Sequence, residues 1–395
     1  MNIDQYDDWE YLAEGNAHLV LSYVGQDRLL TGKVLRLTKR NNALSVDFDL
    51  QFMDDIIAPL VGGTHVDRAE KVAVSDTFLQ AMQHKIQPQQ PTHRRGLALT
   101  TSATLLSDYT RTFAPRPTWT FEVKPKWGFL PRSPWIDEKH SDLKQTMCRF
   151  CMHQRLRGKE QSATWPYCPL DLFSGDHDKM ERALMASLMV SHGYLNMFYN
   201  GLRITAAEDQ KQRFQELFSS PDLSRQDVCK RVARLLCTLL VRDPLLATLK
   251  HLQQTLDGLD VEGIYPMLQA HQPLSTEMAV WKEVLKTYQA RAPDDWQGKK
   301  VLPWDEQRQR LYEYVLSMTF KDCSLMISVT KADNDRALPN SVHVFGQWFK
   351  FEIKMVDVGL KEWAKIPYWF DLDQQIVQYN LQCRTPRDCG SSSLQ

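Results

Sequence analysis

The sequence has no excess charge of one sign and no long apolar run. Its 395 residues carry 48 Lys and Arg against 48 Asp and Glu, a formal net charge of zero at pH 7. A neutral chain does not attract nucleic acid or an anionic membrane over its whole surface, so an anionic ligand must be met by a local group of basic residues. The longest strongly apolar run, Leu235 to Val241, is far too short to span a bilayer. We therefore expect neither nucleic acid nor a membrane as a partner.

Signals for secretion are missing too. The first nine residues are acidic and polar, unlike a signal peptide. Eight cysteines stand at irregular spacings, which without such a signal is typical of reduced thiols in the cytosol or nucleus rather than a disulfide framework. The length exceeds the size at which a single core stops growing, so we expect two lobes or domains.

The most informative stretch is Phe121 to Pro131, with the sequence FEVKPKWGFLP. Because alternate residues of a strand point to opposite faces, Val123 is predicted to face a core while Glu122, Lys124 and Lys126 share the other face. Two lysines at a strand end beside a cleft suit a phosphate-rich ligand. The alternative is a solvated edge strand whose lysines prevent aggregation.

Proline and glycine delimit this stretch. Pro125 has no N–H to donate to a sheet ladder, so the second half must lie at an edge or outside the sheet. Gly128 and Pro131 are expected to end it.

The N-terminal part is predicted to be rich in strands. Tyr11 to Val24 has the pattern of strand, tight turn and strand, and the small residues of Glu14-Gly15-Asn16-Ala17 would let backbone N–H groups approach a phosphate. A plain hairpin is the alternative. The remaining apolar spacings predict a strand over 29–37 and helices over 44–60 and 75–85. Residues 97–103 are expected to form a strand or a connector between lobes.

Helices dominate after Pro131. Pro244 should break the longest one, and Asp222 or Ser224 is expected to cap its start. Apolar spacing predicts helices over 177–199, 206–218, 222–256, 276–290 and 304–319, and strands over 324–330, 341–345 and 349–358. We expect an N-lobe over 1–118, a C-lobe over 119–384 and a disordered tail over 385–395.

A small lobe of strands followed by a larger helical lobe with a late hairpin is the layout of protein-kinase-like folds, so we expect an α+β, two-lobed molecule. In that layout one aspartate acts on the attacking hydroxyl and another holds magnesium. Asp322 lies between a predicted helix and a strand, and Asp357 ends a predicted strand. A helix C-terminal turn and a solvated strand end are the alternatives for each residue alone.

Several stretches together resemble the inositol-pentakisphosphate 2-kinase family. The resemblance implies a kinase that moves the γ-phosphoryl group of ATP, with Mg²⁺, to the axial 2-hydroxyl of inositol 1,3,4,5,6-pentakisphosphate and makes inositol hexakisphosphate, or phytate. It also implies a monomer of the nucleus and cytoplasm. The stretches are 121–131, KDCSLMI at 321–327, CMHQRLR at 151–157, YCPLDLFSG at 167–175, EGNAHLV at 14–20, HVD at 65–67 and LDVEG at 259–263.

The resemblance implies roles for single residues. Asp322 matches the catalytic aspartate, which is also a candidate magnesium ligand, and Asp357 matches the magnesium ligand. Lys124 and Lys126 match a pair that contacts phosphates at the substrate and the reaction centre. The other implied contacts are Gly15, Asn16, Ala17, His18, Arg36 and Glu122 with the nucleotide, and Arg157, Lys361, Lys365 and Tyr368 with the substrate.

The chain departs from the family pattern in the substrate shell. Gly193-Tyr194 stands where the family has paired asparagines, Asn196 where a basic residue is expected, and Gln90-Pro91 where Arg-Pro is usual. Arg94 and Arg95 are candidate substitutes.

These departures leave open a catalytically weakened inositol-phosphate-binding module of the pseudokinase kind, although both aspartates are present. A nucleic-acid-binding protein that uses the basic residues of 144–160 is disfavoured by the zero net charge and by the absence of a base-reading motif.

The cysteines suggest a structural zinc ion. Cys148 and Cys151 have the spacing that lets two thiolates bind one ion, and Cys168 with His140 or His153 would complete a tetrahedron. His140 is the preferred fourth ligand, because the His-Gln motif at 153 also occurs in relatives that lack these cysteines. Three buried reduced thiols are the alternative.

Overall fold

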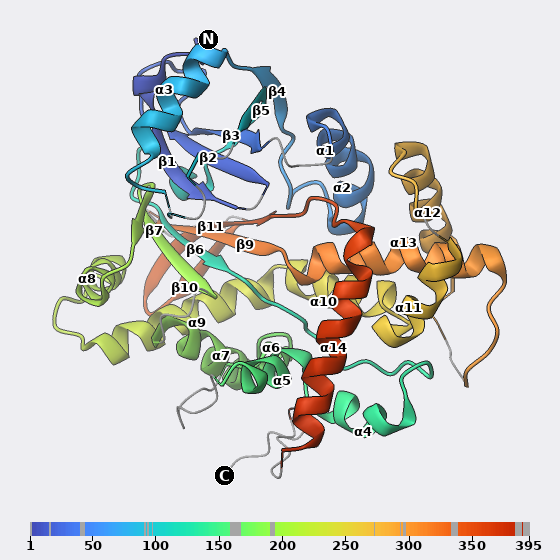
Figure 1. The fold of residues 1–395 in the computed structure, drawn as a ribbon. Coiled ribbons are helices and arrows are strands. Elements are labelled where there is room, and N and C mark those ends of the chain that lie inside the picture. Colours follow the sequence, from blue (N-terminus) through green and yellow to red (C-terminus); the bar gives the residue numbers. More distant parts are fainter. Residues whose placement is uncertain are drawn as a thin grey trace. The chain divides into compact units, whose positions relative to one another are not determined.

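The computed structural model describes residues 2–15, 17–39, 44–90, 92, 95–96, 98–158, 167–189, 194–271, 273–292, 294, 298–332, 339–383 and 389. It is an α+β protein with two sheets and many helices, as expected (Figure 1). No helix in these ranges is long and apolar enough to cross a membrane. The chain divides into two compact units: Met1–Glu122, Asn196–Pro221 and Met326–Lys354 form unit 1, and Val123–Leu195, Asp222–Leu325 and Met355–Gln395 form unit 2.

Unit 1 contains a five-stranded sheet in the order β1-β2-β3-β5-β4, in which neighbouring strands are antiparallel. The predicted strand, turn and strand is confirmed, whereas the third strand begins later than predicted because Leu29 lies in an exposed turn. The strands are β1 (Trp9–Glu14), β2 (His18–Tyr23), β3 (Lys33–Lys39), β4 (Glu70–Ala73) and β5 (Leu99–Ser107).

Helix α3 (Asp76–Ile86) covers one face of this sheet (Figure 1). Its apolar residues recur at helical spacing, and Phe78, Leu79 and Met82 are buried in one core with Leu21 of β2. The other helical segments of unit 1 are η1 (Tyr6–Asp8), α1 (Val46–Phe52), a π-helical turn η2 (Met53–Ile57), α2 (Ala58–Val61), η4 (Tyr109–Arg111) and α8 (Ala207–Leu217).

The second sheet has six strands in the order β10-β11-β9-β6-β7-β8, so β11, β9 and β6 are neighbours. Asp357 directly follows β11, Asp322 precedes β9 and Lys124 directly follows β6. Residues 195–199, predicted as the end of a helix, are a strand, because Met197 and Phe198 are buried in the sheet. The strands are β6 (Trp119–Val123), β7 (Leu195–Tyr199), β8 (Leu202–Ile204), β9 (Ser324–Lys331), β10 (Ser341–Val344) and β11 (Gln347–Val356).

Unit 2 is mainly helical. Ser224 caps α9, its Oγ accepting a hydrogen bond of 3.2 Å from Asp227 N, and Pro244 separates α9 from α10 as predicted. Helix α14 packs against α4, α5 and α11. The helices are α4 (Glu138–Thr146), α5 (Arg149–Leu156), α6 (Pro169–Leu172), α7 (His177–Met189), α9 (Arg225–Arg242), α10 (Leu245–Leu256), α11 (Asp260–His271), α12 (Met278–Ala290), α13 (Trp304–Lys321), η6 (Trp363–Lys365) and α14 (Ile366–Leu381).

Candidate active site

Asp322 is the centre of a charged group in unit 2. It is the C-cap residue of α13, and its carboxylate contacts two ammonium groups. Oδ2 lies 2.8 Å from Lys361 Nζ, and Oδ1 lies 3.6 Å from Lys126 Nζ. The structure thus joins three residues from three segments that the sequence singled out.

The turn after β6 directs Lys126 toward Asp322. β6 ends at Val123, so Pro125 lies outside the ladder as expected. Lys126 has a φ of 63°, a left-handed conformation that is uncommon for a residue with a side chain. Burial lowers the pKa of Lys126, Asp322 opposes this, and the positive charge of Lys124 lowers the pKa further. Lys124 is therefore close enough to Lys126 for the two charges to repel each other.

Asp322 remains a carboxylate near neutral pH. Its partial removal from water alone would raise its pKa, but the ammonium of Lys361, followed by those of Lys126 and Lys124, lowers the pKa overall. The side chain of Asp322 is still 58% exposed, so water screens part of this attraction. The carboxylate can accept a hydrogen bond or a proton from a ligand that approaches from solvent.

Asp357 stands beside this group. It follows β11 with a φ of 62°, and its Oδ2 lies 3.5 Å from Ser324 Oγ, the donor. Cys323 is buried near both aspartates: burial, followed by the charges of Asp322 and Asp357, raises the pKa of its thiol to about 12. Two carboxylates on adjacent strand ends offer the oxygen ligands that Mg²⁺ prefers, so this donor set fits that ion.

The other residues matched to the substrate lie elsewhere in unit 2. Lys365 ends the η6 turn and pairs with Glu362 at 3.4 Å. Tyr368 is exposed in the first turn of α14, and Arg157 is exposed as the C-cap of α5. Lys361, the fourth of these residues, contacts Asp322 directly, a pairing that the sequence did not predict.

On unit 1, the turn between β1 and β2 is closed by a hydrogen bond from Gly15 N to His18 O, 2.9 Å long. Lys39, at the end of β3, binds two residues of this turn. Its ammonium donates to Gly15 O at 2.7 Å and pairs with Glu14 Oε1 at 2.6 Å, and both charged side chains are 1% exposed. Asn16 lies outside the described residues.

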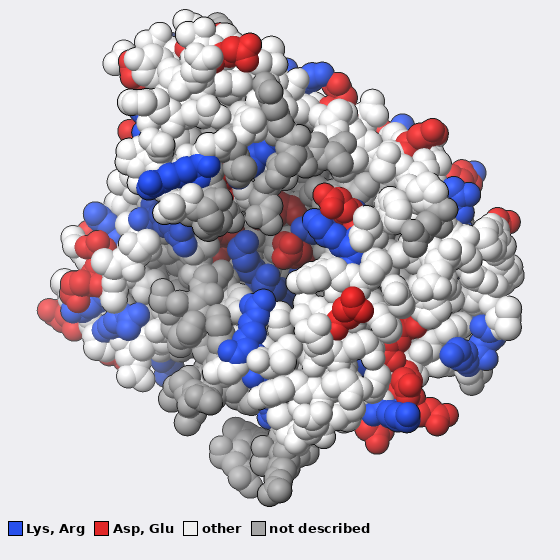
Figure 2. Space-filling view, in the orientation of Figure 1, with Lys and Arg blue, Asp and Glu red and all other residues white. Residues whose placement is uncertain are grey.

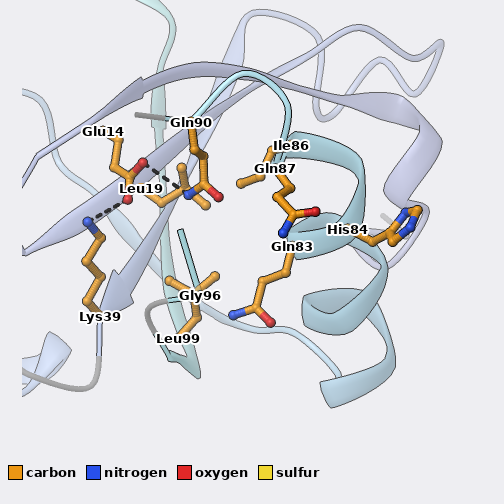
Figure 3. Close-up of a pocket in the computed structure, with 10 residues that line it drawn as sticks. All are labelled: Glu14, Leu19, Lys39, Gln83, His84, Ile86, Gln87, Gln90, Gly96 and Leu99. Atoms are coloured by element: carbon orange, nitrogen blue, oxygen red, sulfur yellow. Dashed lines mark hydrogen bonds and ion pairs between the residues drawn. The ribbon is translucent and has the colours of Figure 1, made fainter. Parts of the chain in front are cut away.

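A cavity of about 240 Å³ opens beside this pair, lined in part by Gln83, Gln87 and Gln90 (Figure 3). Gln90 Nε2 donates to Glu14 Oε2 at 3.1 Å. The cavity is smaller than the range of roughly 300–1,000 Å³ typical of ligand pockets, and the Asp322 group does not line it. We therefore assign the chemistry to the charged group and not to this cavity.

Comparison with known proteins decides the family. The profile described as inositol-pentakisphosphate 2-kinase matches residues 11–375. The chain belongs to the inositol-pentakisphosphate 2-kinase family. Relatives of that name include one from Arabidopsis thaliana, 28% identical over 94% of this chain and 93% of the relative. Those from Cryptococcus neoformans and Danio rerio are 28% and 26% identical, each over 97% of this chain and 95% of the relative.

Two residues implied as nucleotide contacts in this family member have partners in unit 1. Arg36 Nε donates to Thr104 Oγ1 at 3.1 Å. Glu122 Oε2 accepts from Asn196 Nδ2 at 2.7 Å, and Asn196 Oδ1 accepts from Arg203 Nη2 at 2.6 Å. Asn196, which replaces a basic residue of the family pattern, therefore orients Glu122 and links it to an arginine.

Tyr194, which replaces a family asparagine, lies in an aromatic group of unit 2. Its ring is stacked on that of Tyr167 with centroids 5.9 Å apart, and it meets Phe150 edge-on at 5.1 Å. Its hydroxyl accepts from Gln154 Nε2 at 2.9 Å, and its carbonyl accepts from Lys124 N at 2.8 Å. Tyr194 thus packs behind the Lys124 backbone. Gly193, Pro91 and Arg94 lie outside the described residues, and Arg95 Nε donates to Gln90 O.

Four cysteines of this kinase converge in unit 2. The Sγ atoms of Cys148, Cys151, Cys168 and Cys389 all lie within 4.8 Å of one another, and all four residues are buried. Cys148 and Cys168 sulfurs are 3.6 Å apart, close to the roughly 3.8 Å edge of a tetrahedron built with Zn–S bonds of about 2.3 Å. The donor set fits a structural zinc ion. Cys389 is buried although it falls within the segment expected to be disordered, the rest of which lies outside the described residues.

The preference for His140 as the fourth ligand is wrong. Its Nδ1 lies 3.0 Å from Glu262 Oε1 and its Nε2 lies 3.2 Å from Gln378 Nε2, whereas Cys389 completes the cysteine group. Glu262 also belongs to a buried carboxylate group with Asp260 and Asp373, whose centre is filled by the ammonium of Lys144 at 2.6 to 3.1 Å. His140 is therefore part of a buried ion network.

Charged side chains of both signs are visible on the face drawn in Figure 2. Figure 2 shows Lys and Arg side chains gathered in a short run near the centre of the view, with Asp and Glu side chains beside them. Elsewhere on this face the two signs are interspersed, as expected for a chain with formal net charge zero.

Proposed function

We propose that this chain transfers the γ-phosphoryl group of ATP to the 2-hydroxyl of inositol 1,3,4,5,6-pentakisphosphate, giving ADP and inositol hexakisphosphate. The proposal rests on the surroundings of Asp322. Lys126 and Lys361 contact its carboxylate, and Asp357 contacts Ser324, which lies two residues after Asp322 in the chain. Relatives named inositol-pentakisphosphate 2-kinase match this chain over nearly their whole length. They favour this activity over a catalytically weakened inositol-phosphate-binding module. The order of elements supports a two-lobed, protein-kinase-like arrangement.

Asp322 acts on the acceptor. Its carboxylate orients the 2-hydroxyl and takes the proton as the oxygen forms its bond to phosphorus and the bond to ADP breaks. The low pKa of Asp322 keeps it deprotonated for this role. Because phosphoryl transfer needs little covalent chemistry from the protein, most of the acceleration comes from position and from neutralised charge.

The lysines supply that charge. A substrate with five phosphates requires several converging cations, and Lys124, Lys126 and Lys361 provide them within one group. Lys361 contacts Asp322, and we assign it to a substrate phosphate as well. We assign Arg157, Lys365 and Tyr368 to the substrate side too. On the nucleotide side we assign Gly15, Asn16, Ala17, His18, Arg36 and Glu122.

Asp357, with Asp322 beside it, would hold Mg²⁺, since both offer hard oxygen ligands. When bound, the ion neutralises charge on the transferring phosphoryl group. We also propose that Cys148, Cys151, Cys168 and Cys389 hold a structural zinc ion, because four buried sulfurs at these separations match its tetrahedral ligand set.

The test is direct. The purified protein is incubated with magnesium ATP and inositol 1,3,4,5,6-pentakisphosphate, and the products are separated by anion-exchange chromatography. We expect inositol hexakisphosphate and ADP in equal amounts. ATP hydrolysis without a new inositol phosphate, or tight binding without turnover, would reject the proposed reaction.

A further inference from the structure

The group formed by Lys126 and Asp322 depends on two backbone segments that are far apart in the sequence. Lys126 lies in the turn after β6 in a left-handed conformation, which persists only where the surroundings fix it. Asp322 lies just past α13, where the last helix carbonyls lack partners inside the helix. Lys126 thus lies outside regular secondary structure, and Asp322 is joined to the last turn of α13 by a hydrogen bond of 3.3 Å from its N–H to Thr319 O.

Gln253 of α10 is bonded to both segments. Its Oε1 accepts from Gly128 N at 2.8 Å, and its Nε2 donates to Lys126 O and to Phe320 O, each at 2.9 Å. The side chain is fully buried. The side-chain amide of Gln253 thus supplies hydrogen-bond partners to the turn that carries Lys126. It also supplies one to a carbonyl at the end of the helix that carries Asp322.

We propose that Gln253 is a positioning residue for phosphoryl transfer, which fixes how the Lys126 ammonium and the Asp322 carboxylate face each other. The inference rests on the proposed function of those two residues. Among the residues that the structure describes, the Gln253 side chain bonds only to backbone groups of their segments, so it acts through them.

A second link from the end of α10 reaches the same two segments. Asp257, the C-cap of α10, pairs with the buried ammonium of Lys321 at 2.5 Å. That ammonium lies 4.1 Å from the ring centroid of Trp127, a cation–π distance. Lys321 precedes Asp322 and Trp127 follows Lys126. The C-terminal end of α10 is therefore linked to both segments through Lys321.

No apolar side chain can make the hydrogen bonds of the Gln253 amide. Methionine has a similar shape but leaves Gly128 N, Lys126 O and Phe320 O without this partner in a buried site. The turn or the helix end must then shift to find other partners. A misplacement of about 1 Å in a reacting group lowers the rate by roughly 100-fold.

The test compares Gln253→Met with a matched control. In Gln309→Met, a half-buried glutamine of α13 loses donated bonds of 2.9 Å to Val284 O and 2.8 Å to Glu313 Oε1. Both variants should lose stability on thermal unfolding. We expect kcat of Q253M to fall about 10- to 100-fold with dissociation constants for magnesium ATP and inositol pentakisphosphate within about threefold by calorimetry, and kcat of Q309M to stay near wild type.

A double-mutant cycle separates positioning from general loosening. Because Gln253 acts through Lys126 and Asp322, Q253M should lower the residual kcat of the double variant Lys126→Met/Asp322→Asn by less than about threefold. Equal losses in the wild-type and double-variant backgrounds, an unchanged kcat in Q253M, or the same kcat loss in Q309M would each overturn the inference. If Q253M does not fold, Gln253→Glu keeps an acceptor for Gly128 N, loses both donors, and is expected to show the same kinetic pattern.

The single variants Asp322→Asn and Lys126→Met distinguish this inference from the proposed function. If neither lowers kcat, the proposed roles are wrong. If both lower kcat and Q253M does not, only the role of Gln253 is wrong.

Discussion

Asp322 and Asp357 lie next to the ends of the neighbouring strands β9 and β11 yet differ in their partners, and this difference separates their expected kinetics. Asp322 is contacted by two lysines, and Asp357 by a serine hydroxyl. Asp322→Asn should leave both ligands bound and lower turnover by roughly two to four powers of ten, the range for lost general acid–base help. Turnover and calorimetric binding measure this, and near-wild-type turnover would reject the role.

Asp357→Asn should instead weaken magnesium-dependent nucleotide binding, because it removes a charged ligand of the ion. Raising the magnesium concentration should restore part of its activity, and a magnesium titration of turnover measures this for both variants. Rescue of Asp322→Asn alone would mean that the two roles are reversed.

Lys361 should control the acid limb of the pH profile. Its ammonium lies 2.8 Å from Asp322 and is the main charge that lowers the pKa of this carboxyl, whereas burial acts in the opposite direction. In Lys361→Met the pKa of Asp322 should rise, so Asp322 is protonated at higher pH and the acid limb of kcat moves to higher pH. The shift should be modest because the carboxylate is 58% exposed.

The control for this pH profile is Lys286→Met, which removes a lysine that is 77% exposed and paired with Glu283 on α12. Its acid limb should match that of the wild type. An unchanged limb in Lys361→Met would show that Asp322 is not the titrating group.

At the scale of elements, apolar spacing predicted α9, α10, α12 and α13, since each buries an apolar stripe. It missed α14, where the buried face includes Asp373 and Asn380. Asp373 is buried because Lys144 neutralises it, and a partner on another helix leaves no mark in the local pattern. Sequence periodicity alone therefore cannot detect a helix whose buried face is partly polar.

The sequence revealed those site residues whose position in the local pattern is itself informative. Asp322, Asp357 and Lys126 stand at predicted element ends, where a functional role could be inferred. Gln253 lies near the end of the predicted helix 222–256 and Lys39 lies two residues past the predicted strand 29–37. Only the three-dimensional fold shows what each one contacts. Residues that act through backbone groups of distant segments give no local signal.

The turn after β6 leaves little room for added bulk. A Cβ at Gly128 would lie 2.4 Å from the ring of Phe173, so Gly128→Ala must displace the turn or the ring. We expect a loss of about 1–3 kcal/mol in the free energy of unfolding, as for overpacking, together with a lower kcat because Lys126 shares this turn. Chemical denaturation and turnover measure the two effects.

Phe173→Leu in the Gly128→Ala background should recover part of both, since it removes ring atoms from the clash. Gly298→Ala is the control, because nothing lies within 4 Å of its added Cβ. A Gly128→Ala protein with wild-type stability and kcat would show that the turn adapts freely.

At the scale of the whole molecule, the cysteine group connects three regions of unit 2. Cys148 caps α5, Cys168 precedes α6, and Cys389 lies near the C-terminal end, where its N–H donates to Thr146 O at 2.9 Å. The sequence indicated the first three ligands through the spacing of Cys148 and Cys151 and the nearby Cys168. Cys389 could not be inferred, because it is distant in the chain and is followed by glycine and serine.

The zinc content and thermal stability of cysteine variants test this connection. Protein purified without chelator should contain about one zinc per chain, as one tetrahedral site requires. Cys389→Ser should lower the zinc content and the melting temperature, because metal-binding free energy is also folding free energy. Cys383→Ser is the matched control: this cysteine lies in the same region, but its thiol donates to Tyr379 O outside the group. Elemental analysis and thermal unfolding with and without chelator measure both variants, and a zinc-free wild type, or equal zinc loss in the two variants, would contradict the assignment of Cys389.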